Sequence, residues 1–211
     1  MIKNALSLYF IAGTQDCPKG IEETLKEAIE GGVTIFQFRE KGKGSLQSAE
    51  AREKLAVRLQ SICRTAGIPF IVNDDVELAL TIGADGVHVG QNDAKASELT
   101  TLLKGKILGV SVHSAEEAER ALADGADYVG VGPVYPTSSK EDAKEAKGTA
   151  IVEEIRNAGI DVPMVGIGGI TAENARAVRR AGADGVSVIS SISKAESPLL
   201  AARELKRAVL L

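Results

Sequence analysis

The stretch FIVNDDVELALTIGADGVHVGQND, residues 70–93, contains one strand–helix–strand unit. Phe70–Val72 is short and rich in β-branched residues, as expected of a buried parallel strand. Val76–Ile82 has apolar residues at helical spacing, and Val87–Val89 predicts the next strand. Parallel strands joined in this way end on the same side of a sheet, where such folds carry their chemistry. The polar residues expected to converge there are Asn73, Asp74 and Asp93.

The same alternation of strands and helices continues from Leu8 to the end of the chain. Eight strands favour a closed (β/α)8 TIM barrel over an open doubly wound sheet, which usually has fewer strands and a glycine-rich first turn. Gly13-Thr14-Gln15, after the first strand, is no dinucleotide fingerprint. We therefore expect an α/β fold with a single TIM-barrel domain over residues 1–211. The predicted strands are Leu8–Ala12, Val33–Arg39, Phe70–Asn73, Gly86–Val89, Ile107–Val112, Tyr128–Val131, Met164–Ile167 and Gly185–Ile189.

Local signals mark the turns and the helix starts. Gly-Ala-Asp occurs at Gly83–Asp85, Gly125–Asp127 and Gly182–Asp184, each time between a predicted helix and a predicted strand. The three aspartates lie at strand starts, on the face opposite the predicted site, so we expect them to be structural. Thr171 predicts the start of a helix over Ala172–Ala181.

Composition narrows the class of partner. A net charge of -4 and a pI of about 5.4 argue against a nucleic-acid surface, which needs a basic face. No run of residues reaches membrane-spanning length. Cys17 and Cys63 have neither metal-binding spacing nor a disulfide framework, so we expect free thiols in the cytoplasm. Small soluble molecules are the expected partners, and a homodimer is a further possibility.

Strand alternation over residues 35–41 places Gln37, Arg39 and Lys41 on one side and Phe36 and Phe38 on the other. The apolar side is expected to face the helices, so the polar side faces the barrel mouth. Two cations there indicate a phosphate-bearing ligand. A salt bridge from these cations to Glu40 or a neighbour is the structural alternative.

Two later loops also predict anion binding. Gly166–Thr171 and Val188–Ser191 follow the seventh and eighth strands, the usual phosphate-binding position in TIM barrels. Asp74 and Asp93 would repel a phosphate unless a divalent cation lay between them, although either residue could simply cap a helix. Mg²⁺ suits carboxylates combined with phosphate oxygens.

Further polar residues lie at strand ends and in one long loop. His88, Ser111 and His113 are predicted to point inward, and each could orient a ligand. The polar segment Gly132–Gly148 is long for a compact domain unless it serves as an active-site loop, in which Lys140 could clamp an anion.

From Leu8 to about Leu205 the chain closely resembles the thiamine-phosphate synthase family. Six separated motifs in the family's order carry the resemblance. They are Gln37-Phe-Arg39-Glu-Lys41, Asn73-Asp74, His88-Val-Gly-Gln-Asn-Asp93, Gly109-Val-Ser111, Pro136-Thr-Ser-Ser-Lys140 and Val165-Gly-Ile-Gly-Gly-Ile170. The resemblance implies an enzyme that joins hydroxymethylpyrimidine diphosphate to thiazole phosphate and releases pyrophosphate by a dissociative route.

The resemblance also implies a role for each matching residue. Asp74 and Asp93 would hold Mg²⁺, and Gln37 and His88 would line the pyrimidine pocket. The diphosphate would be held by Arg39, Lys41, Asn73, Ser111 and Lys140, of which Arg39, Ser111 and Lys140 are the expected catalytic residues. The thiazole phosphate side would consist of Thr137, Ser139, Gly169, Ile189 and Ser190. Ser139 replaces a threonine that is commoner in the family, which keeps the hydroxyl.

Two other functions compete with this interpretation. A thiazole tautomerase on the same barrel would use acid–base residues such as His113 and would not need Asp74, Asp93 and Lys140 together. A non-catalytic sensor of a phosphate ligand would need an output surface, and nothing in the sequence resembles one.

Overall fold

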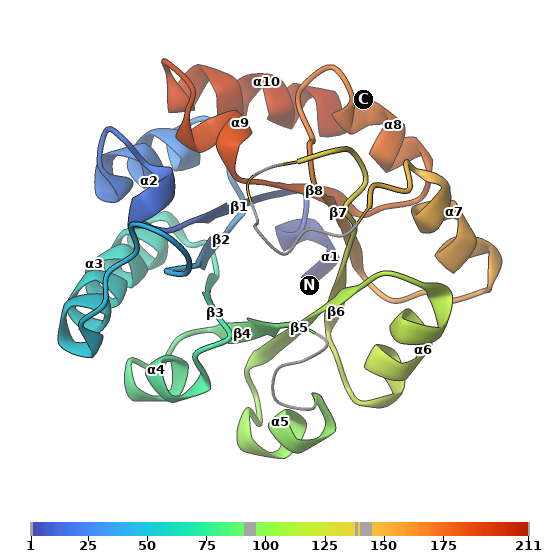
Figure 1. Ribbon diagram of the computed structural model, residues 1–211, viewed down its shortest axis with the longest axis horizontal. Helices are drawn as coiled ribbons and strands as arrows, with labels where there is room; N and C mark the ends of the chain where they lie inside the picture. Colours follow the sequence, from blue (N-terminus) through green and yellow to red (C-terminus); the bar gives the residue numbers. More distant parts are fainter. Residues whose placement is uncertain (1, 91–95, 138, 140–144, 211) are drawn as a thin grey trace.

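The computed structural model describes residues 2–90, 96–137, 139 and 145–210. Eight parallel strands close into a barrel in chain order, with β8 pairing with β1. Figure 1 looks along this barrel. The predicted (β/α)8 TIM barrel is confirmed. The strands are β1 (Leu8–Ala12), β2 (Ile35–Phe38), β3 (Phe70–Asn73), β4 (Gly86–Val89), β5 (Ile107–Val112), β6 (Tyr128–Val131), β7 (Met164–Ile167) and β8 (Gly185–Val188).

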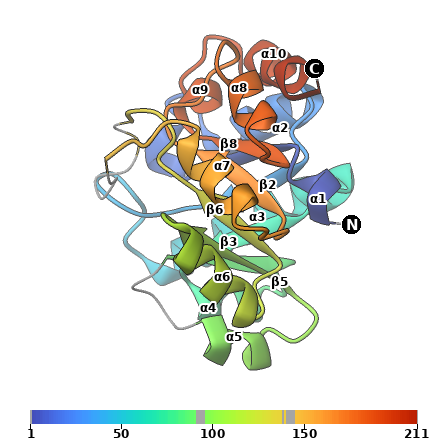
Figure 2. The same cartoon turned by 90° about the vertical axis from the view of Figure 1, so that its right-hand side faces the viewer.

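The helices surround the ring of strands, except for the short α1 (Figure 1). In Figure 2, α1 and the N-terminus lie at one end of the barrel, away from the loop that follows β6. Within the described residues, none of the helices combines the length and apolar character that a membrane crossing requires. The helices are α1 (Ile2–Ala5), the 3₁₀ turn η1 (Thr14–Asp16), α2 (Ile21–Glu30), α3 (Ala49–Ala66), α4 (Val76–Thr81), α5 (Ala96–Leu102), α6 (Ala115–Ala123), α7 (Ala150–Asn157), α8 (Ala175–Arg180), α9 (Ser190–Ser193) and α10 (Pro198–Leu210).

Strand alternation divides the apolar side chains into two cores. The outer core lies between the strands and the helices, and Phe36 and Phe38 belong to it, as predicted. The inner core fills the closed part of the barrel, below the carboxyl ends of the strands. Its buried members are Leu6, Tyr9, Ile11, Ile35, Ile71, Tyr128, Val165 and Ile189. The inner core thus forms a packed floor under the barrel mouth.

The three Gly-Ala-Asp turns have the structural role expected of them. The carboxylates of Asp85, Asp127 and Asp184 each accept a hydrogen bond of 2.8 Å from a backbone N–H of the preceding strand. Each aspartate therefore ties the start of its own strand to the strand beside it. This contact lies at the amino end of the barrel, away from the predicted site.

The predicted helix start at Thr171 is wrong. Helix α8 begins at Ala175, because Thr171 and Asn174 form a turn in which the Thr171 N–H donates to Asn174 Oδ1 at 2.9 Å. The side chain that was expected to cap the helix contacts Glu173 instead.

Candidate active site

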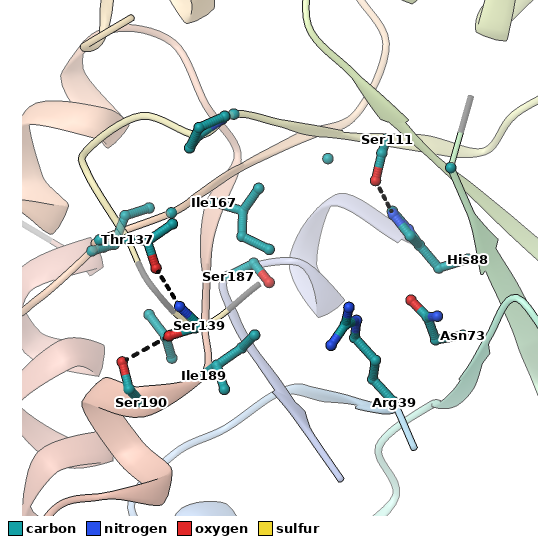
Figure 3. A pocket seen from close by; sticks show the side chains of 18 of the residues that line it. Arg39, Asn73, His88, Ser111, Thr137, Ser139, Ile167, Ser187, Ile189 and Ser190 are labelled. Carbon is teal, nitrogen blue, oxygen red and sulfur yellow. Dashed lines mark hydrogen bonds between the residues drawn. The ribbon is translucent and has the colours of Figure 1, made fainter. Parts of the chain in front are cut away.

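A cavity of about 450 Å³ opens at the carboxyl ends of the strands, where the sequence predicts the site. Figure 3 shows it from close by. Most of the predicted site residues line it, although they come from seven separate segments of the chain. They are Arg39, Lys41, Asn73, Asp74, His88, Ser111, Thr137, Ser139, Gly169, Ile189 and Ser190.

Of the three remaining predicted residues, the structure describes only Gln37. Gln37 lies on β2, two residues before Arg39, and is buried. Its amide donates to the Tyr9 hydroxyl at 2.8 Å. Asp93 and Lys140 lie outside the described residues, so their positions stay predictions. Within the described residues, no three His, Cys, Asp or Glu side chains gather closely enough to hold a metal ion by themselves.

One side of the cavity has the cations that the alternation of β2 predicted. Arg39 is only 8% exposed. No described carboxylate lies within 4 Å of its guanidinium group. Glu40 accepts hydrogen bonds from Thr14 and from the Leu46 N–H instead. The salt bridge considered as the structural alternative is therefore present for Lys41, which pairs with Asp74, but absent for Arg39 within the described residues. A buried cation that faces a cavity favours an anionic ligand.

Asp74 faces the same side, and its backbone explains why. It is the only described non-glycine residue with a positive φ, at 60°, and its N–H donates to the His88 carbonyl at 2.9 Å. The cap of helix α4 is the next residue, Asp75, whose carboxylate accepts from the Leu78 N–H at 3.0 Å. Asp74 is thus not occupied as a cap. Its carboxylate pairs with Lys41 at 2.7 Å.

The opposite side of the cavity presents the hydroxyl groups of Thr137, Ser139 and Ser190 (Figure 3), and Gly169 lines the cavity as well. Ser139 Oγ lies 3.2 Å from Ser190 Oγ, and the Ser139 N–H donates to Thr137 Oγ1 at 3.2 Å. Gly169, in the loop after β7, has a φ of 59°. A Cβ there would lie 2.5 Å from the Pro136 carbonyl oxygen, so this glycine lets the loops after β6 and β7 approach each other. This side of the cavity is thus formed by the loops after β6, β7 and β8, whereas the cations of the other side follow β2.

A buried polar network was not predicted from the sequence. The hydroxyls of Tyr9 and Tyr128 lie 2.7 Å apart, Tyr128 Oη lies 3.0 Å from His88 Nδ1, and His88 Nε2 lies 2.9 Å from Ser111 Oγ. The period-2 rule that placed Gln37 inside also places both tyrosines inside. Ser187, whose buried hydroxyl has no partner among the described residues, was missed as well and lines the cavity.

His113 also lines the cavity, as expected, but it is held at the rim. Its Nδ1 lies 3.0 Å from Glu117 Oε2, which also accepts from the His113 N–H. Ser114 caps helix α6 beside it. His113 therefore belongs to a helix-capping cluster at the edge of the site.

Comparisons with known proteins agree with this geometry. The family model described as "Thiamine monophosphate synthase" matches residues 8–192. The chain is 59% identical over 208 residues to a thiamine-phosphate synthase of Geobacillus kaustophilus, covering 99% of this chain and 94% of that protein. It is 56% identical to one of Bacillus velezensis, over 99% and 93% of the two chains.

A solved structure shows the same likeness in three dimensions. Thiamine phosphate pyrophosphorylase from Pyrococcus furiosus superposes with a TM-score of 0.89 at 34% identity, over 100% of this chain and 98% of that one. The family model spans the strands and loops that form the cavity. The chain belongs to the thiamine-phosphate synthase family and is a transferase.

Proposed function

We propose that this enzyme transfers the hydroxymethylpyrimidine group from its diphosphate to the ring nitrogen of thiazole phosphate, with Mg²⁺ as cofactor, and releases pyrophosphate. The observation that carries the proposal is one cavity with two chemically different sides, each suited to a phosphate group. One side presents the buried guanidinium of Arg39, and the other presents the glycine and hydroxyl groups around Gly169 and Ser190. A reaction that joins two phosphorylated molecules needs both sides.

The residues divide by the part of the substrates that they would contact. On the diphosphate side, Arg39, Lys41, Asn73 and Ser111 would bind the leaving group, with Lys140 as a further clamp. The pyrimidine ring would lie toward His88 and Gln37, above the inner core. The thiazole phosphate side would consist of Thr137, Ser139, Gly169, Ile189 and Ser190.

Asp74 fits a role in holding Mg²⁺. Its carboxylate lines the cavity on the side of the cations, and the neighbouring Asp75, not Asp74, caps helix α4. Carboxylate oxygens are the hard donors that Mg²⁺ prefers. Asp93 would be the second carboxylate ligand. When bound, the ion would supply positive charge close to the departing pyrophosphate.

The reaction requires no side-chain nucleophile. The bond between the pyrimidine methylene carbon and the diphosphate oxygen breaks, and its electron pair leaves with pyrophosphate. The aminopyrimidine ring delocalises the resulting positive charge, and the lone pair of the thiazole nitrogen then forms the new C–N bond. Arg39, Lys41 and Lys140 would stabilise the leaving charge, while the loops after β7 and β8 would hold the thiazole in line.

One assay separates this function from its rivals. The protein, residues 1–211, is mixed with both substrates and Mg²⁺, with and without EDTA. The amounts of pyrophosphate and thiamine phosphate formed are then measured. Release of pyrophosphate that EDTA abolishes and added Mg²⁺ restores is the expected result. Isomerisation of a thiazole that EDTA leaves unchanged would make the enzyme a tautomerase, and binding without turnover would make it a sensor. Either outcome would contradict the proposal.

A further inference from the structure

Four hydrogen bonds connect the closed interior of the barrel to the cavity. Gln37 Nε2 donates to Tyr9 Oη at 2.8 Å, and Tyr9 Oη lies 2.7 Å from Tyr128 Oη. Tyr128 Oη lies 3.0 Å from His88 Nδ1, and His88 Nε2 lies 2.9 Å from Ser111 Oγ. Figure 3 shows the last link, from His88 to Ser111. We call these five residues the tyrosine relay.

The relay has a direction, because each of its phenols has one proton to donate. The Tyr9 oxygen accepts from Gln37. Among the described residues, both phenol protons then have an acceptor only if Tyr9 donates to Tyr128 and Tyr128 donates to His88 Nδ1. Burial raises the pKa of both tyrosines well above the ordinary value, so both phenols stay protonated. An imidazole that accepts at Nδ1 carries its proton on Nε2, the nitrogen that faces Ser111.

The packing holds the two rings of the relay in place. A Cβ at Gly109 would lie 2.2 Å from Tyr128 Cζ and 2.5 Å from His88 Nδ1. A Cβ at Gly130 would lie 3.2 Å from His88 Cε1. Glycine at these two inward positions on β5 and β6 therefore makes room for both rings, and close packing keeps the His88 nitrogens in their places.

We propose that Tyr9 and Tyr128 are positioning residues that hold His88 as the neutral tautomer protonated on Nε2, so that Ser111 accepts from His88 and turns its own proton toward the substrate. A diphosphate oxygen only accepts hydrogen bonds, so it requires a donor from Ser111. With the reverse direction, Ser111 would give its proton to His88 and present a lone pair to an anion. The catalytic part of this inference rests on the proposed function, whereas the tautomer does not.

Long-range ¹H–¹⁵N NMR of the ligand-free, ¹⁵N-labelled protein measures the tautomer directly. The chain has two histidines, and His113→Asn assigns their two sets of ring signals. The expected result for His88 is a protonated Nε2 and an unprotonated Nδ1. A proton on Nδ1 would overturn the proposal, and this measurement on the wild-type protein requires no relay variant to fold.

Tyrosine variants then test the cause. Tyr128→Phe removes the donor to Nδ1, so the His88 signals should move toward a mixture with the Nδ1–H tautomer while those of His113 stay unchanged. Tyr135→Phe is the matched control, since Tyr135 is the third of the three tyrosines and lies outside the relay. Its His88 signals should match the wild type. Unchanged His88 signals in Tyr128→Phe would refute the role of the relay.

Steady-state kinetics test the consequence for turnover. Tyr128→Phe should lower kcat by about 3- to 10-fold, the scale of one hydrogen bond, with little change in the KM for thiazole phosphate. If the wild-type protein has the expected His88 tautomer but shows no synthase activity, the proposed function is refuted and the tautomer still stands. An altered tautomer with an unchanged kcat would refute the catalytic part of the inference.

Discussion

Lys41 and Asp74 form an ion pair of 2.7 Å across the rim of the barrel, between the loops that follow β2 and β3. The Lys41 side chain is 51% exposed and that of Asp74 is 25% exposed, so solvent screening limits what the pair contributes to stability. The proposed function gives each partner a different ligand, the diphosphate for Lys41 and Mg²⁺ for Asp74. The pair thus keeps two binding groups close together at the site where both ligands would meet.

Asp74→Asn should lower kcat by roughly 10²-fold or more, the scale observed when one preorganised electrostatic group is lost. The amide keeps the size of the side chain but removes the charge that would bind Mg²⁺. Turnover measured over a range of Mg²⁺ concentrations checks this, and a higher Mg²⁺ requirement is expected.

The adjacent carboxylate provides the matched control for Asp74→Asn. Asp75→Ala removes the cap of α4, which should cost about 1 kcal/mol of stability but leave the Mg²⁺ requirement unchanged. Wild-type turnover in Asp74→Asn, or equal losses of turnover in both variants, would argue against the metal role of Asp74.

The sequence predicted the strands well because their β-branched runs are short and separated by clear turns. Six strands have the predicted bounds, while β2 and β8 are shorter than expected. Local signals were less reliable where several residues could play one role. Asn73, Asp74 and Asp75 can all cap a helix, and only the structure shows that Asp75 caps α4 whereas Asn73 and Asp74 line the cavity.

The site residues were predicted as far as strand alternation reaches. Alternation places Gln37, Arg39 and Lys41 on one side but gives no depth, so it did not show that Gln37 lies below the cavity. The contact between Tyr9 and Tyr128 joins residues 119 positions apart in the sequence. It depends on closure of the barrel and on the room left by Gly109, neither of which is a local property of the sequence.

Asp184→Ala should reduce the free energy of unfolding by about 1–3 kcal/mol without a change in kcat. The Asp184 carboxylate accepts from the buried Met164 N–H at 2.8 Å and from Arg156 at 2.9 Å, so its removal leaves both donors without this partner. Asp161→Ala is the control, because Asp161 also lies near Arg156 but is 86% exposed. Urea unfolding and a turnover assay on both variants check this, and a large kcat loss in Asp184→Ala would contradict a purely structural role.

Alkaline pH should destabilise the fold through its two cysteines. Cys17 and Cys63 are free and buried, and burial raises the pKa of each thiol to about 12. In the unfolded chain the thiols ionise near pH 9, so the unfolded state releases protons that the folded state retains. The free energy of unfolding should therefore fall as the pH rises from about 9 toward 12, by up to ~1.4 kcal/mol per pH unit for each thiol.

Denaturant unfolding between pH 8 and pH 10 measures this slope. Cys63→Ala removes one of the two titrating thiols, so the slope should become shallower than in the wild-type protein. An equal slope in both proteins would show that other groups cause the loss of stability.

Gly109→Ala should be far more damaging than Gly130→Ala, although both substitutions add one methyl group at an inward position. The added Cβ at position 109 would overlap the Tyr128 ring at 2.2 Å, whereas at position 130 its nearest contact is 3.2 Å from the edge of the His88 ring. Overpacking of this kind costs about 1–3 kcal/mol, and here the two rings of the tyrosine relay would have to move. Thermal unfolding should show a lower midpoint for Gly109→Ala, and NMR should show altered His88 signals. If Gly109→Ala kept the wild-type stability and the wild-type His88 signals, the two rings could not be packed against β5 as described, and the direction of the relay would lose its structural support.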